Sequence, residues 1–176
     1  MKLNPAAQIY AGKNPDGAIF GEAPTLAIMR KAYGEGFAAS WLMPQIFDLV
    51  VYSNSRGTLN EQQAEFLAEA IANEYFYLKA SELLLFFYRF KLGRYGHFYG
   101  VVDPMKVTQA LAEFVRERNA AIDAKRQEEE KEEREKSAEN AISLREYCRL
   151  NGIPETDNIL EAIANVKPPT AYEPNS

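Results

Sequence analysis

Apolar residues recur three and four positions apart along most of the first 122 residues, which is the spacing of an amphipathic helix. Short segments that contain glycine, asparagine or serine separate these stretches and favour loops. The pattern predicts helices over about residues 25–32, 37–52, 61–73, 81–92 and 104–122. The sequence therefore predicts an all-α fold.

The most apolar of these stretches predicts a helix at the centre of the fold. Residues 81–92 leave little polar face, and a helix that is apolar on nearly all sides packs inside a bundle. Gly93 matches a glycine stop, and Arg89 and Lys91 lie in the last turn, where bases favour the negative end of the helix dipole. We expect a compact bundle of about five helices around this aromatic helix.

The composition of the chain changes along its length and predicts five segments. Prolines and glycines are dense before residue 24, and the residues from Asp123 to Lys136 hold seven acids, five bases and no large apolar residue. The predicted segments are an irregular N-terminal arm (1–23), a helical core domain (24–122), a charged helical spacer (123–140), a small amphipathic helical module (141–166) and a disordered tail (167–176).

Charge and cysteine content narrow the function classes. The net charge is −5 and the pI is near 5.1, so nucleic-acid binding would need a local basic patch. The single Cys148 excludes an intrachain disulfide framework and fits a reducing compartment. No apolar run reaches the roughly 18–20 residues of a membrane helix, and the first residues show no signal peptide. We expect a cytoplasmic protein without a membrane segment.

No pattern of residues in the sequence points to catalysis. His97 is the only histidine, and no cysteine or acidic pattern at metal-ligand spacing surrounds it. The sequence contains no glycine-rich phosphate fingerprint and no nucleophile elbow. We therefore expect a protein that is not an enzyme and that has no catalytic residues, no bound metal and no cofactor.

The loop that follows the central helix is the candidate binding site. Five basic and two acidic residues lie between Tyr75 and Lys106, although the chain as a whole is acidic. The candidate partner-binding or nucleic-acid-binding residues are Lys91, Arg94, Tyr95, His97, Phe98 and Tyr99. Outward-facing rings and cations would contact a protein, or bases and phosphates. The alternative is that the rings fold back over the central helix as a buried turn.

The segments after residue 122 offer a second interaction candidate. A charged helical spacer followed by an amphipathic helical module resembles a tethered protein-interaction module. The alternative is that this module docks on the main domain.

One stretch of the chain carries a resemblance to a known group of proteins. The run LKASELLLFFYRFKLGRYGHFYGVVDPMKVTQALAEFVRERN resembles an uncharacterised family carried by phages and mobile elements of gut bacteria, with the pattern FK-x-GRYG-x-FYG-x-VDP. The resemblance covers about residues 25–122. It brings no known activity.

A looser likeness is to phage helicase-loader and replisome-organiser proteins. It rests on the order of the helices and on the placement of Leu59, Glu61, Ala70 and Tyr75. This likeness implies a protein partner, such as a helicase or another replisome component. The expectation is a non-enzymatic accessory protein of phage or mobile-element DNA replication. The alternatives are a nucleic-acid-binding protein that uses the basic aromatic loop 91–100, and a structural or regulatory scaffold.

Overall fold

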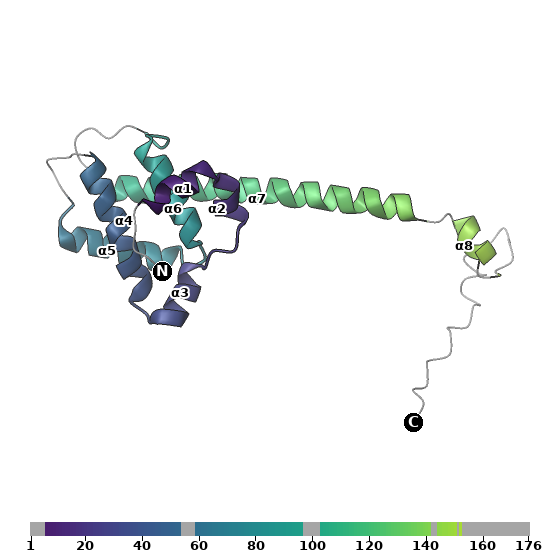
Figure 1. Cartoon of the computed structure of the whole chain (residues 1–176), viewed down its shortest axis with the longest axis horizontal. Coiled ribbons are helices and arrows are strands. Elements are labelled where there is room, and N and C mark those ends of the chain that lie inside the picture. Colours follow the sequence, from purple (N-terminus) through teal and green to yellow (C-terminus); the bar gives the residue numbers. More distant parts are fainter. Residues whose placement is uncertain (1–5, 54–58, 97–102, 142–143, 151, 153–176) are drawn as a thin grey trace, which may run out of the picture. The chain divides into compact units, whose positions relative to one another are not determined.

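The described residues fold into helices and contain no β-strand, which confirms the all-α prediction. The computed structural model describes residues 6–53, 59–96, 103–141, 144–150 and 152 (Figure 1). Its helices are α1 (Ala7–Lys13), α2 (Pro15–Phe20), α3 (Leu26–Tyr33), α4 (Phe37–Ser53), α5 (Glu61–Glu74), α6 (Ala80–Lys91), α7 (Pro104–Asn140) and α8 (Leu144–Leu150). The chain forms two compact units, residues 1–126 and residues 127–176.

Helix α6 lies at the centre of the first unit, as its apolar sequence predicts. Helices α1, α2 and α4 all contact it. Its fully buried large apolar side chains are Leu83, Leu85, Phe86, Phe87 and Phe90. The ring of Phe86 lies 5.7 Å from that of Phe114 on α7, and 5.2 Å from that of Phe87. Tilted rings at these distances attract each other and make α6 the aromatic core of the unit.

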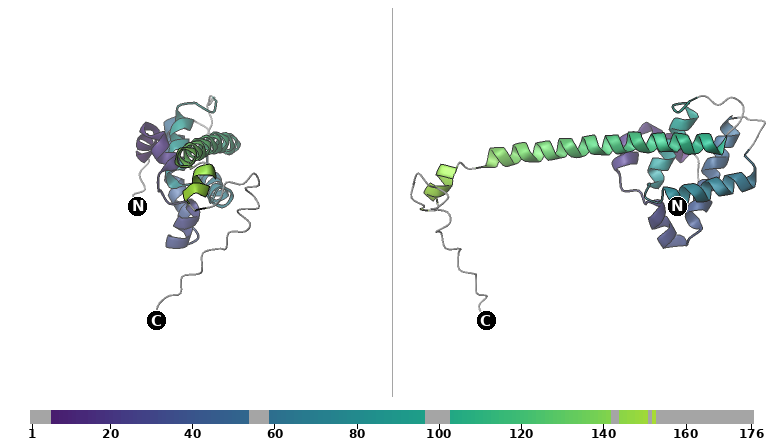
Figure 2. Two further views of the ribbon diagram at one scale, coloured as in Figure 1. Left: turned by 90° about the vertical axis from the view of Figure 1, so that its right-hand side faces the viewer. Right: turned by 180° about the vertical axis from the view of Figure 1, so that it is seen from behind.

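Helices α4 and α5 pack against each other and close the core on another side (Figures 1 and 2). Their facing residues are buried: Trp41, Leu42, Ile46 and Leu49 on α4, and Ala64, Leu67, Ala68 and Ile71 on α5. Asn60 begins α5, because its side chain accepts the Gln63 amide at 2.8 Å while the Gln63 side chain accepts the Asn60 amide at 3.0 Å. This reciprocal cap satisfies two backbone donors that a helix start leaves unpaired.

The N-terminal segment is helical, so the prediction of an irregular arm was wrong for residues 7–20. Asn14 caps α2 by accepting the Gly17 amide at 2.9 Å, and Pro15 occupies the first turn, where its missing amide costs nothing. Gly12 lets α1 approach α6, because a Cβ at this position would lie 2.2 Å from the ring of Tyr88. Gly12, Asn14 and Pro15 are therefore compatible with two short helices that pack against the core.

The start of α6 is a polar junction inside the apolar core. The Glu82 side chain is completely buried, and its Oε2 accepts the Lys79 amide at 2.8 Å. Its Oε1 accepts the Arg118 guanidinium of α7 at 2.7 Å. The Lys79 ammonium donates to the backbone oxygens of Ile19 at 2.7 Å and Gly21 at 2.8 Å. These bonds tie α2, α6 and α7 together at one point.

Helix α7 changes from buried to exposed where its apolar pattern ends. Its buried residues in the first unit are Val107, Ala110, Leu111 and Phe114. Ile122 is the last residue of α7 that packs against the core, and the side chains from Asp123 to Glu139 are exposed.

In the second unit, ion pairs four residues apart run along the exposed helix. Glu130 pairs with Arg134 at 3.8 Å, and Glu132 pairs with Lys136 at 3.5 Å. Each such exposed pair contributes only about 0.2–0.5 kcal/mol to a helix. The charged spacer is therefore helical over its described length. Residues 153–166 of the predicted amphipathic module and the predicted tail over 167–176 lie outside the described residues.

We predict that Arg118→Ala lowers the free energy of unfolding by about 3 kcal/mol, because it leaves the buried Glu82 carboxylate without its charged partner. Urea denaturation of the full chain measures the loss. Arg134→Ala is the control, since an exposed ion pair is worth less than about 1 kcal/mol. Equal, small losses in both variants would show that the Glu82–Arg118 pair does not hold α6 to α7.

Candidate partner-binding site around the end of helix α6

A glycine turn ends α6 and reverses the chain toward α7. Gly93 adopts φ +75°, a conformation that residues with a Cβ rarely take. Its amide donates to the Phe90 oxygen at 2.9 Å, and the Arg94 amide donates to the Arg89 oxygen at 3.2 Å. The predicted glycine stop is confirmed, and the turn directs the next side chains back over the core.

Tyr95 folds back onto the aromatic core. Its ring centroid lies 5.9 Å from that of Phe86, and its hydroxyl lies 3.5 Å from Oε2 of Glu117. Burial, followed by the Glu117 carboxylate, raises the pKa of Tyr95 to about 12, although Arg89 and Arg94 act in the opposite direction. The Tyr95 ring therefore folds back over the central helix and does not face outward, which is the alternative that the sequence left open.

The candidate cations of this region each contact a carboxylate. Lys91 pairs with Asp48 of α4. Arg94 Nε lies 3.2 Å from Glu117 Oε1, and Arg89 Nη1 lies 3.2 Å from Glu117 Oε2. Arg94 keeps 52% of its side chain exposed, whereas Lys91 keeps only 15%. Internal pairing lowers the positive potential that these side chains would otherwise offer to phosphates.

The other half of the predicted site lies outside the described residues. His97, Phe98 and Tyr99 all belong to this part of the chain. The structure therefore places Lys91, Arg94 and Tyr95 of the six predicted residues. It brings Arg94 and Tyr95 together at Glu117, and it directs Lys91 to α4.

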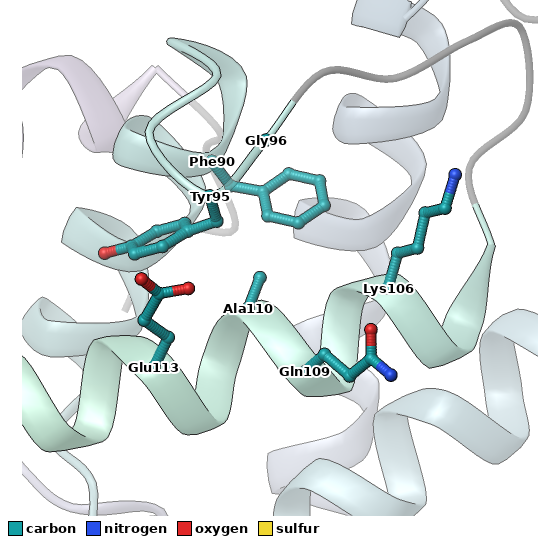
Figure 3. A pocket seen from close by; sticks show the side chains of 7 residues that line it. All are labelled: Phe90, Tyr95, Gly96, Lys106, Gln109, Ala110 and Glu113. Carbon is teal, nitrogen blue, oxygen red and sulfur yellow. The ribbon is translucent and has the colours of Figure 1, made fainter.

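A cavity of about 260 Å³ opens between the turn and α7. Figure 3 shows the rings of Phe90 and Tyr95 on one side and α7 on the other. Residues of α7 line its floor: Lys106, Gln109, Ala110 and Glu113. Its lining carries one base and one acid together with two rings.

Two further cavities lie where α4 and α6 end. One, of about 320 Å³, is lined by Leu49, Tyr52, Ser53, Lys91, Leu92, Gly93 and Gly96. The other, of about 350 Å³, is lined by Ala6, Gln8, Ile9, Asp48, Tyr52, Tyr88, Lys91 and Leu92, and we name it the α1 cavity. Tyr52, Lys91 and Leu92 line both, so the two cavities adjoin.

The rim of the α1 cavity exposes large apolar side chains. Ile9 is 53% exposed, Tyr52 is 60% exposed and Leu92 is 66% exposed. The Lys91 ammonium lies 5.5 Å from the centroid of the Tyr52 ring, a distance at which a cation and a ring attract each other. Exposed apolar groups gathered around a hollow are typical of protein or ligand contact surfaces.

One member of a buried amide pair, Gln8, forms part of the wall of the α1 cavity. Gln8 is 2% exposed, and its Nε2 donates to Oε1 of Gln45 at 2.8 Å. Gln8 Oε1 and Gln45 Nε2 have no hydrogen-bond partner among the described residues. A buried polar atom without a partner costs free energy, so this pair is an expensive feature of the core.

Sequence reasoning missed the residues that α1 brings to this site. Gln8 and Ile9 fall in the segment that was predicted to be irregular. The signal that could have found the helices was Asn14 followed by Pro15. Asparagine is a common helix cap, and proline is accepted in the first turn of a helix. That signal marks α2 directly and limits α1 to the residues before it.

The described residues contain no group of three or more His, Cys, Asp or Glu side chains placed to hold a metal ion. Among the described helices, none combines the length and the apolar character that crossing a membrane requires.

Fold and site together define an all-α protein with an apolar, hollowed surface around the end of its central helix. A family model described as a family of unknown function (DUF6633) matches residues 59–158, and the chain belongs to this family. Comparisons with curated proteins and with solved structures found no match.

We predict that Tyr95→Phe removes part of the loss of stability at high pH. The pKa of Tyr95 is about 12 in the folded protein and 10.0 for an ordinary tyrosine. The contribution of its protonated hydroxyl to the free energy of unfolding is therefore complete below pH 10 and disappears as the pH rises toward 12. Unfolding midpoints of both proteins between pH 9 and pH 12 measure the effect. Parallel curves for the two proteins would contradict the half-buried position of the hydroxyl.

We also predict that Gln8→Leu with Gln45→Leu destabilises the protein less than Gln8→Leu alone. The single variant leaves Gln45 Oε1 buried without its donor, which costs about 1–3 kcal/mol, whereas replacing both partners by apolar groups is close to neutral. Thermal unfolding of the two variants and the natural protein measures the order. A double variant that is less stable than Gln8→Leu alone would contradict the cost assigned to the unpaired amide.

Proposed function

We propose that this protein is a non-enzymatic accessory protein of phage or mobile-element DNA replication that acts by protein–protein contact, in the manner of a helicase loader. The observation that carries the contact role is the rim of Ile9, Tyr52 and Leu92 around the α1 cavity. Large, exposed, apolar side chains beside a cavity are the kind of surface on which interface hot spots form.

The distribution of charge also supports a protein partner. Residues 127–176 contain twelve acidic and six basic residues, so this part of the chain repels a phosphate backbone. The bases of the described loop are paired with Asp48 and Glu117. A nucleic-acid site at Lys91, Arg94 and Tyr95 is therefore the alternative with less support.

The replication role rests on the resemblance of residues 25–122 to phage and mobile-element proteins and on the architectural likeness to helicase loaders. Such proteins pair a small helical body with a segment that reaches a helicase. Here the helical body is followed by the charged helix over 127–140, whose exposed surface is free of large apolar residues.

The test mixes the full chain with the replicative helicase of the host bacterium and measures complex formation by light scattering after gel filtration. We expect a complex that Tyr52→Ser with Leu92→Ser weakens at least tenfold. Phe66→Ser is the matched control, because Phe66 is 75% exposed on α5 and lines none of the three cavities.

Two other outcomes would reject the proposal. Binding of single-stranded DNA, with an affinity that falls steeply with salt and without any helicase complex, would establish the nucleic-acid alternative. Binding of neither helicase nor nucleic acid would leave the structural or regulatory scaffold.

A further inference from the structure

The described residues that line the α1 cavity leave no charge unpaired. Its two charged lining residues, Asp48 and Lys91, pair with each other, and the Lys91 ammonium also lies 5.5 Å from the centroid of the Tyr52 ring. Gln8 Oε1 is shielded from solvent, and Gln8 Nε2 donates to Gln45. An ionic occupant would lose its water here without gaining a charged partner, so the cavity favours an uncharged, apolar group.

The walls favour an aromatic ring over an aliphatic group. Tyr52 and Tyr88 line the cavity, and the side chain of Tyr52 is more than half exposed. Pairs of aromatic rings attract each other beyond the effect of the area that they bury. A volume of about 350 Å³ is at the small end of the range for binding pockets, so it suits one ring and the groups that flank it.

The rim of the cavity indicates that this ring belongs to a protein. Ile9, Tyr52 and Leu92 each line the cavity, and each is more than half exposed. A small molecule held inside the cavity would leave the outer parts of these side chains in water. A protein that inserts one side chain would cover them with the surface around that side chain, as happens around the anchors of protein interfaces.

We infer that the α1 cavity receives a phenylalanine side chain of the partner protein. Phenylalanine is aromatic and carries no hydrogen-bonding group, whereas buried tyrosine and tryptophan need a partner for the O–H or the N–H. Leucine and methionine are apolar but lack the ring that Tyr52 and Tyr88 favour. This inference rests on the proposed function, since it names the side chain by which the partner is anchored.

The first test uses N-acetylphenylalanine amide and N-acetylcyclohexylalanine amide, which have similar shapes but differ in aromatic character. Nuclear magnetic resonance of the nitrogen-labelled full chain follows the backbone amides of Ile9 and Leu92 during titration with each compound. We expect the phenylalanine compound to bind at millimolar concentrations, to shift these signals, and to bind about threefold more tightly than the cyclohexyl compound. Because the cyclohexyl ring is the more apolar of the two, equal or tighter binding of that compound would overturn the aromatic assignment.

Variants link this preference to Tyr52. Tyr52→Leu keeps the wall apolar but removes an exposed ring, so it should bind the two compounds with equal affinity. Phe66→Leu is the matched control, because it also replaces an exposed ring by leucine, lies on α5 and lines none of the three cavities. It should keep the threefold preference. Persistence of the preference in Tyr52→Leu would place the bound ring elsewhere and overturn the inference.

A third arm compares other rings and separates a protein side chain from a free ligand. N-acetyltyrosine amide and N-acetyltryptophan amide should bind more weakly than the phenylalanine compound, and tighter binding of either would assign the cavity to that side chain instead. Toluene carries the ring of phenylalanine without the peptide groups. Exclusion of N-acetylphenylalanine amide while toluene binds would mean that the cavity takes a small molecule, and the docking role would be wrong.

The two proposals fail in different ways. Absence of binding by all the ring compounds, together with an intact helicase complex, would reject the phenylalanine anchor and leave the proposed function standing. Binding of N-acetylphenylalanine amide that depends on Tyr52, without any helicase complex, would reject the helicase as the partner and keep the cavity as a phenylalanine site.

Discussion

The structure depends on a carboxylate that is buried at the start of its most apolar helix. Glu82 lies within α6, where burial of an unpaired charge would cost several kcal/mol, so it needs both the Lys79 amide and the Arg118 guanidinium. Because Arg118 belongs to α7, this requirement fixes α7 against α6. The rings of Phe86 and Phe114 then meet across the same contact. One polar junction thus sets the register in which the aromatic core packs.

The candidate site lies at the C-terminal end of α6, and the packing register of α6 on α7 determines its surroundings. Once α7 is fixed, Glu117 lies beside the turn and pairs with Arg89 and Arg94, while Tyr95 covers Phe86. The two guanidiniums therefore share one carboxylate, and the turn packs against α7 on this side. On the other side, α1 and α4 leave apolar side chains exposed around the α1 cavity. The surface that remains for a partner is mainly apolar.

The sequence predicts local features well and distant pairings poorly. Helix periodicity and the glycine at residue 93 predict α3 to α7 and the turn, because both signals lie within a few residues of their effect. The cations of the turn look unpaired in the sequence because Asp48 lies 43 residues from Lys91 and Glu117 lies 23 residues from Arg94. Gln8 was missed for a related reason, since short helices rely on tertiary contacts more than on propensity.

Amide hydrogen exchange of the full chain tests the central claim most directly. If Glu82 and the aromatic core hold α6 in place, its amides exchange only through global unfolding, with the same urea dependence as denaturation of the first unit. Amides of the exposed helix over 128–139 exchange much faster, through local opening. Exchange of α6 by local opening, at a free energy well below that of global unfolding, would contradict the account.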